Sequence, residues 1–309
     1  LYIIRGKIMK IALCLSGLAE GTNDIGRNSG GIDYSFPHFK EHFFDKYDVD
    51  VFAHSWSTEA EDKILDLFKP KKYIIEKQIK FKPGKYRKIP GHKRDQEAKF
   101  GKALAKGRAY RDVVKGYHPP KNRKQQCYSQ WYSRKKSVEL KKEYEIENNF
   151  TYDFVMISRF DVCFFTDIPF ADLDSDYLYA PENTDPLIDG KKAKYNAALI
   201  YKKNPERVEF KTNSWKAKGL MDFWFLSSSK NMDEFAKLFD HLDSYFDKKF
   251  HGCEHAATRH ARDMILDWKE EHREGPKDAS KSPCKALRQI LHRTKDYELV
   301  RRWYLDSIY

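Results

Sequence analysis

The chain has 309 residues, of which 40% are hydrophobic and 34% charged, enough for one sizeable core or for one core with a small appended lobe. No apolar run approaches the roughly 18 residues that cross a bilayer, and the run at 11–15 is too short for a signal-peptide core. We therefore expect a cytoplasmic protein without a transmembrane segment. The five cysteines are widely spaced and form no CxxC pair, so we expect reduced thiols and neither a disulfide scaffold nor a zinc ribbon.

The net charge of +12 is unevenly placed along the chain. Residues 69–142 hold 25 Lys and Arg against 5 Asp and Glu, whereas the rest of the chain holds 33 against 41. Such a segment attracts polyanions, whether nucleic acid, acidic polysaccharide or the phosphorylated headgroups of a membrane surface. Peripheral membrane contact therefore stays open, as does the simpler interpretation of a solvated, lysine-rich surface.

The first part of the chain alternates between strand and helix patterns. In chain order, the predicted elements are a strand at 10–15, a helix at 36–46, a strand at 48–56, a helix at 58–69 and a strand at 71–77. This alternation is typical of an α/β protein with a mostly parallel sheet.

Residues 80–126 interrupt the alternation with prolines and glycines among dense lysines, and we interpret them as a basic insertion that contains a helix at 95–115. An amphipathic helix at 127–149 then leads into a strand. The remaining predicted elements are strands at 152–165, 176–180, 196–203 and 219–229, helices at 231–246 and 254–268, and a last strand at 297–301.

The strand at 152–165 is apolar until it meets Arg159 and Asp161. Such an apolar run is typical of a strand buried in a covered sheet. In open α/β sheets ligands bind outside the carboxyl ends of the strands, which would place these two charges where a phosphate or a metal-bound phosphate is met. A salt bridge that only closes the strand end explains the spacing equally well.

The loop SGLAEG at 16–21 follows the first predicted strand. Backbone N–H groups in such a loop can cradle a phosphate. The loop matches neither GxGxxG nor GxxxxGKS, which disfavours classical dinucleotide binding and P-loop hydrolysis. Arg27, further along, could add a bidentate phosphate contact, although an isolated loop arginine is more often simply solvated.

Two acids are notable for their surroundings. Asp222 lies inside the apolar run 220–226, where an unpaired carboxylate costs several kcal/mol unless it has a partner or a function. We favour a function for it, as the base that removes a proton from an acceptor hydroxyl. Glu254 opens a predicted helix, where a first-turn acid facing the helix dipole is the favoured interpretation.

The sequence lacks the motifs of serine hydrolases, cysteine nucleophiles and zinc sites. There is no GxSxG elbow, and no Cys/His nucleophile pair is indicated. The cluster HGCEHAATRH matches no zinc spacing. Mg²⁺ or Mn²⁺ needs few protein ligands because substrate phosphates supply the rest, so Asp161 alone could begin such a site, with one histidine of the cluster to complete it.

Six motifs in order resemble the bacterial and viral glycosyltransferases of GT-A type: MKIALCLSG, DVDVFAHSW, SQWYS, YDFVMISRFDVCF, MDFWFLSSSKNMDEF and CEHAATRH. The Arg-x-Asp element stands in place of the usual Asp-x-Asp. The resemblance implies a Rossmann-like, mostly parallel central sheet flanked by helices. It implies one domain over 9–267, with a nucleotide-binding half at 9–165 and an acceptor-binding half at 166–267. The basic insertion at 80–126 and a C-terminal helical extension at 268–309 would complete the chain.

The resemblance also implies roles for individual residues. It places Ser16 and Gly17 near the nucleotide diphosphate and His54 and Trp56 near the base or ribose, with Gln130 and Arg134 on the helix beside them. Asp161 would lie at the metal or ribose position, with Arg159 adjacent. Asp222 would lie by the sugar and the acceptor hydroxyl, and Glu254 would be a second candidate base. A divalent cation, Mn²⁺ or Mg²⁺, would be the cofactor. Because the residue two beyond Asp161 is Cys163, only one acid of the element remains and metal dependence stays open.

The predicted function is that of a hexosyl- or pentosyltransferase. It would move a sugar from a nucleotide-sugar donor to a hydroxyl of a glycan or another polyanionic acceptor, modified DNA included. Direct displacement with inversion is the simplest course, and retention stays open. The alternatives are a non-catalytic nucleic-acid-binding protein that uses residues 69–142 and their interleaved aromatics, and a nucleotidyltransferase on a similar sheet.

Overall fold

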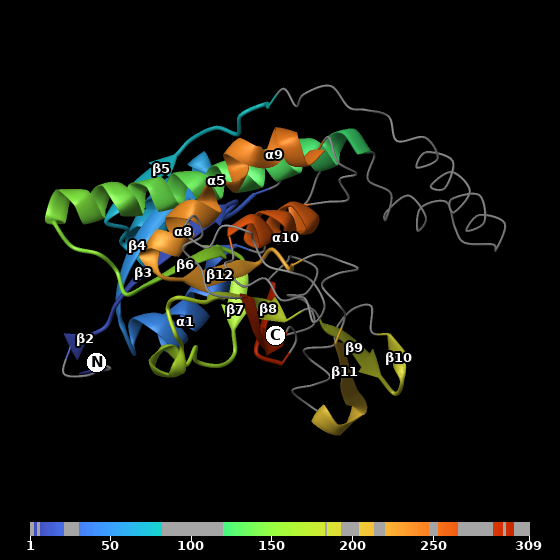
Figure 1. The fold of residues 1–309 in the computed structure, drawn as a ribbon. Coiled ribbons are helices and arrows are strands. Elements are labelled where there is room, and N and C mark those ends of the chain that lie inside the picture. Colours follow the sequence, from blue (N-terminus) through green and yellow to red (C-terminus); the bar gives the residue numbers. More distant parts are fainter. Residues whose placement is uncertain are drawn as a thin grey trace.

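The computed structural model describes residues 3–4, 7–21, 31–81, 120–182, 184–192, 204–212, 220–246, 253–264, 287–292 and 295–299. Its centre is a seven-stranded mixed sheet in the order β13-β8-β12-β6-β3-β4-β5 (Figure 1). The strands are β3 (Lys10–Gly17), β4 (Asp48–Ser55), β5 (Lys72–Ile75), β6 (Phe154–Arg159), β8 (Leu178–Glu182), β12 (Trp224–Ser227) and β13 (Leu287–His292). Strands β6, β3, β4 and β5 are parallel, and only β12 runs against its neighbours. The predicted α/β class with a mostly parallel sheet is confirmed.

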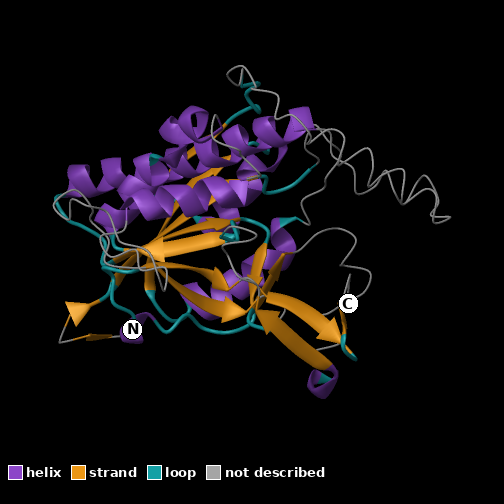
Figure 2. Cartoon of the chain, turned by 45° about the vertical axis from the view of Figure 1, so that its right-hand side comes forward, coloured by secondary structure: helices purple, strands orange, loops and turns teal. Residues whose placement is uncertain are grey.

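Helices cover both faces of this sheet (Figures 1 and 2). One face carries α1 (Ile32–Phe39), which continues into a π-helical turn at Lys40–Phe44, and α2 (Glu61–Phe68), preceded by a 3-10 turn at Thr58–Ala60. The other face carries α5 (Pro120–Asn148), α8 (Ser229–Ala236), α9 (Leu238–Phe246) and α10 (Cys253–Met264). Because both faces are covered, the central strand β3 is buried from Ile11 to Ser16, which explains its unbroken apolar run.

Smaller elements surround the main sheet. They are β1 (Ile3–Ile4), β2 (Lys7–Ile8), β7 (Val162–Phe164), β9 (Thr184–Ile188), β10 (Lys191–Lys192), β11 (Val208–Thr212) and β14 (Tyr297–Leu299), with 3-10 turns at Phe170–Asp172 and Pro205–Arg207. Strand β7 pairs with β14, and β9 lies between β10 and β11 in a separate sheet that projects from the main body (Figure 1). Among the described residues, no helix is long and apolar enough to cross a bilayer.

Several predicted boundaries need correction. Residues 120–126 belong to α5 and not to an insertion, and the helix predicted at 231–246 is divided at Lys237 into α8 and α9. The C-terminal region, expected to be helical, contributes two strands: β13 completes the main sheet through parallel pairing with β8, and β14 confirms the strand predicted at 297–301. The strands of the β9 sheet were not predicted. The helix expected at 95–115 and the strand expected at 196–203 lie outside the described residues.

A buried ionic network fixes α5 against α8. The side chain of Lys141 is fully buried. Its ammonium contacts Glu145 Oε2 at 2.9 Å, Asp233 Oδ1 at 2.7 Å and Ser229 Oγ at 2.5 Å. Glu145 also accepts hydrogen bonds from Ser229 Oγ and from the backbone N–H of Tyr152. Each charge in the network therefore has a partner, which is the condition under which buried charges are tolerated.

We predict that Lys141→Met lowers the free energy of unfolding by about 3–5 kcal/mol, because it leaves buried carboxylates without a counter-charge. The matched control is Lys142→Met. Lys142 is 54% exposed and lies 3.3 Å from the other oxygen of Asp233, so its loss should cost at most about 1 kcal/mol. Urea denaturation measures both variants, and equal losses would contradict this role of the network.

Candidate functional site

The predicted site residues gather along one edge of the main sheet. The parallel strands β3, β4 and β6 end together there, since Ser16 is in register with both His54 and Arg159. Strand β12 is antiparallel to β6 and so begins at the same edge, where the N–H of Arg159 donates to the carbonyl of Phe223 at 3.3 Å. Asp222, the residue before Phe223, is thereby brought to the carboxyl ends of the parallel strands.

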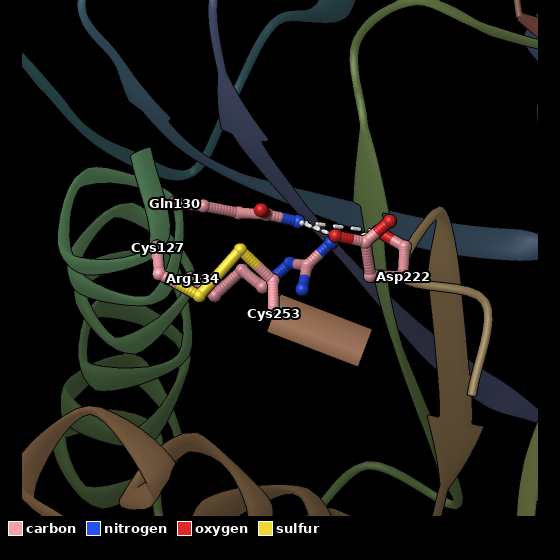
Figure 3. The surroundings of a disulfide bond; sticks show 5 residues. All are labelled: Cys127, Gln130, Arg134, Asp222 and Cys253. Atoms are coloured by element: carbon pink, nitrogen blue, oxygen red, sulfur yellow. Dashed lines mark hydrogen bonds between the residues drawn. A yellow bond between two sulfur atoms is a disulfide. The ribbon is translucent and has the colours of Figure 1, made fainter. Parts of the chain in front are cut away.

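Helix α5 crosses this edge and supplies further side chains. Gln130, Ser133 and Arg134 are spaced three and four residues apart, which places them on one face of the helix. Figure 3 shows Gln130 and Arg134 extending from α5 toward Asp222. Nε2 of Gln130 donates to Oδ2 of Asp222 at 2.7 Å, and Nη2 of Arg134 donates to the Asp222 backbone carbonyl. Gln130 thus orients the Asp222 carboxylate, and Oδ1 accepts no hydrogen bond from the part of the chain that the structure describes.

Arg134 is fully buried, yet two of its nitrogens, Nε and Nη1, have no hydrogen-bond partner among the residues that the structure describes. Its guanidinium lies 4.4 Å from the ring centroid of Trp131 and 5.5 Å from that of Phe225. Burial lowers the pKa of Arg134 to about 10, the carboxylates of Asp222 and Glu254 act in the opposite direction, and the guanidinium keeps its charge at neutral pH. Buried charged donors without acceptors are costly, so this guanidinium is suited to receive an anion.

Arg159 and Asp161 form a bidentate pair. Nε and Nη2 of Arg159 donate to the two carboxylate oxygens of Asp161 at 2.7 and 2.6 Å, and Asp161 is only 4% exposed. Both oxygens that could coordinate a cation are therefore already engaged. No group of three His, Cys, Asp or Glu side chains within the described ranges is arranged to hold a metal ion. The predicted Mn²⁺ or Mg²⁺ site at Asp161 does not fit these residues, and the salt-bridged strand end is the arrangement observed.

His54 is engaged on both ring nitrogens. Nδ1 lies 2.8 Å from Ser133 Oγ, and Nε2 lies 3.1 Å from Glu76 Oε1. Burial lowers the pKa of His54, although Glu76 acts in the opposite direction, so the ring is neutral. One arrangement satisfies both contacts, in which Nε2–H donates to Glu76 and Nδ1 accepts from Ser133. His54 therefore supports the strand ends, and its predicted contact with a base or ribose would require it to release one of these partners.

The backbone of the loop after β3 is also engaged. Ser133 Oγ accepts from the N–H of Gly17 at 2.8 Å, and Ser57 Oγ accepts from the N–H groups of Ala19 and Glu20 at 3.1 and 3.0 Å. A phosphate could bind these three N–H groups only by displacing Ser133 or Ser57, and the predicted backbone cradle at 16–21 stays a prediction. Gly17 itself has φ of 100°, and a Cβ there would meet nothing within 4 Å, so its Cα borders open space.

The remaining predicted site residues are Ser16, Trp56 and Arg27. Ser16 is buried and donates to the carbonyl of Ser158, which leaves its hydroxyl engaged within the sheet. Trp56 stacks on Tyr132 with ring centroids 5.5 Å apart, and its Nε1 is buried without a partner. Arg27 lies outside the described residues.

A disulfide joins Cys127 of α5 to Cys253, the first residue of α10 (Figure 3). The sequence predicted reduced thiols, because no local spacing signals a pair that is 126 residues apart. Cys253 precedes Glu254, whose carboxylate acts on Arg134. Further along α10, Oγ1 of Thr258 accepts from the N–H of Leu220 at 2.8 Å, two residues before Asp222. Helix α10 thus supports the site at two points.

Sequence reasoning missed Ser133, Glu76 and Tyr132. Ser133 was within reach of prediction, because SQWYSR places it between Gln130 and Arg134 on one helical face. Glu76 and Tyr132 had no such signal, since Glu76 belongs to the chain after β5 and meets His54 only in the folded sheet.

We predict that Ser133→Ala destabilises the protein by about 1–3 kcal/mol, because it removes the acceptor of the Gly17 N–H and the partner of His54 Nδ1. Ser137→Ala is the control, since Ser137 is equally buried on α5 but bonds only to its own helix, at the Arg134 carbonyl. Denaturation midpoints should fall clearly for the first variant and little for the second. Equal losses of stability in the two variants would contradict the bridging role of Ser133.

We also predict that the double variant Cys127→Ser/Cys253→Ser is less stable than the wild type by about 2–5 kcal/mol, because the bridge closes a long loop in the unfolded chain. Wild type treated with a dithiol reductant should match the double variant, and Cys163→Ser, which changes a buried cysteine outside the disulfide, serves as the control. Mass spectrometry of a non-reduced digest should detect the 127–253 cross-linked peptide. Its absence from freshly purified protein would contradict the pairing.

Comparisons with known proteins assign no family to the chain. No family model matches it, and no curated protein matches it significantly. The function is therefore inferred from the side chains at the sheet edge.

Proposed function

We propose that this protein is a GT-A-type glycosyltransferase that moves a sugar from a nucleoside diphosphate sugar to a hydroxyl group of a glycan or other polyanionic acceptor. The observation that carries the proposal is the Asp222 carboxylate, which Gln130 orients beside the buried guanidinium of Arg134 at the carboxyl ends of parallel strands. A carboxylate and a cation with unused hydrogen-bond donors are what this chemistry requires at one place.

The reaction follows from these two groups. The acceptor oxygen attacks the anomeric carbon and forms the new C–O bond, while Asp222 takes the proton of the acceptor hydroxyl. The bond between the anomeric carbon and the diphosphate oxygen breaks, and its electron pair leaves with the nucleoside diphosphate. Donors at the sheet edge stabilise the negative charge that develops on this leaving group. Direct displacement of this kind inverts the anomeric centre.

The position of the groups also supports the proposal. Ligands of open α/β sheets bind outside the carboxyl ends of the strands. Asp222 is largely buried, with 9% of the residue exposed, and it lies just before the start of β12. Glu254, the second candidate base, is close enough to act on Arg134 and is more readily understood as its counter-charge.

Nucleic-acid binding by residues 69–142 is less well supported in the part of that segment which the structure describes. Its lysines are mostly engaged in ion pairs with acids of the same protein: Lys71 with Asp50, Lys72 with Glu143 and Glu147, Lys135 with Asp240, Lys136 with Glu139, and Lys141 and Lys142 with Asp233. Paired lysines contribute less to a field that attracts phosphates.

The test is turnover by Asp222→Asn, measured as release of nucleoside diphosphate from a panel of nucleotide sugars. The variant should lose about 100- to 10,000-fold in rate, because the amide cannot accept the proton. Thermal stabilisation by the nucleoside diphosphate should persist, since binding does not need the base. Asp240→Asn, which alters a surface carboxylate paired with Lys135, should keep wild-type turnover.

Three outcomes would overturn the proposal. Unchanged turnover in Asp222→Asn would show that Asp222 is not the catalytic base. Consumption of a nucleoside triphosphate with release of pyrophosphate would indicate a nucleotidyltransferase. No stabilisation by any nucleotide, together with tight and salt-sensitive DNA or RNA binding, would indicate a binding protein.

A further inference from the structure

We propose that Arg134, and not a divalent cation bound to Asp161, neutralises the diphosphate of the donor, so that binding and transfer are independent of metal ions. This inference rests on the proposed function. It identifies the positive charge that stabilises the leaving diphosphate.

The first step is the engagement of Asp161. A hard cation such as Mn²⁺ or Mg²⁺ needs carboxylate oxygens that are free to face it. Both oxygens of Asp161 accept hydrogen bonds from Arg159, in the two-point geometry that makes arginine–carboxylate pairs strong. Metal binding would have to break this pair, which joins the nearly buried carboxylate of Asp161 to the partly exposed guanidinium of Arg159. Cys163, two residues beyond Asp161, has a thiol that contacts the Tyr34 carbonyl, and it offers no oxygen ligand.

The second step is the state of Arg134. Within the described part of the chain, Nη2 donates to the Asp222 carbonyl and the other two guanidinium nitrogens have no acceptor. The aromatic rings of Trp131 and Phe225 hold the guanidinium in place, so its donors are oriented before any ligand arrives. Arginine presents paired N–H groups that match phosphate oxygens, and an anion would satisfy the two donors that remain.

The third step is access. Nε and Nη1 are covered in the structure, so an anion reaches them only when a covering group moves aside. The carboxylates of Asp222 and Glu254 both act to raise the pKa of Arg134, so negative charge already lies near the guanidinium. A diphosphate that reached this position would accept hydrogen bonds from Nε and Nη1, which Asp222 leaves unused.

The fourth step is the alternative source of positive charge. Arg159 is also at the edge and is partly exposed, but its charge is neutralised by Asp161. In the loop after β3, the N–H groups of Gly17, Ala19 and Glu20 already bond to Ser133 and Ser57. Arg134, by contrast, is a buried arginine whose Nε and Nη1 have no hydrogen-bond partner among the described residues.

The experiment measures binding of a panel of nucleoside diphosphates to the wild-type protein in EDTA and in Mn²⁺. We expect the nucleotide that binds to do so with the same affinity in both conditions. Binding that disappears in EDTA and returns with Mn²⁺ would overturn the inference while the proposed function stands. If no nucleotide binds in either condition, the proposed function fails and this inference fails with it.

Variants then test the residue itself. Arg134→Met should weaken nucleoside diphosphate binding about 10- to 100-fold, and Arg134→Lys, which keeps the charge but not the fork, should recover part of the loss. Binding of the same nucleoside without phosphates should stay unchanged in both variants, which separates loss of a phosphate contact from damage to the fold. Lys135→Met removes a positive charge one residue away, from a pair with Asp240, and should bind as wild type does. Wild-type affinity in Arg134→Met would overturn the assignment.

Discussion

The packing of α5 across the main sheet is the constraint on which the rest of the structure depends. This helix contacts β3, β4 and β5 as well as α8 and α9, so one rigid element touches most of the fold. Toward its C-terminus Lys141 and Glu145 build the buried ionic network, and nearer its N-terminus Gln130, Ser133 and Arg134 face the strand ends. A shift of one residue along the helix would remove both sets of contacts, because neighbouring residues on a helix point about 100° apart.

Satisfied and unsatisfied polar groups are unevenly distributed over the molecule. In the network around Lys141 each charged group has a partner, which is the pattern of a structural element. At the sheet edge Arg134 keeps two donors without acceptors, and Asp222 keeps one carboxylate oxygen without a donor from the described chain. Natural proteins accept such costs mainly at functional sites, so this contrast between the two ends of α5 supports the proposed function.

The edge also divides into a supporting part and the part to which we assign the reaction. Ser133, His54 and Glu76 form a chain of hydrogen bonds that holds Gly17 and the end of β4. Gln130 and Arg134 instead bond to Asp222. The disulfide joins α5, which carries Gln130 and Arg134, to α10, which carries Glu254. Residues that resemble binding groups in the sequence thus include several that act by positioning their neighbours.

The sequence by itself determined the α/β alternation, the buried strands β3 and β6 and the placing of Arg159, Asp161 and Asp222 at strand ends, because apolar periodicity and chain order are local properties. It could not determine that β13 joins β8, that Cys127 meets Cys253, or that Arg159 occupies both oxygens of Asp161. Those contacts depend on which groups meet after the chain has folded. The free donors of Arg134 are likewise a tertiary result, since only packing against Trp131 and Phe225 removes them from water.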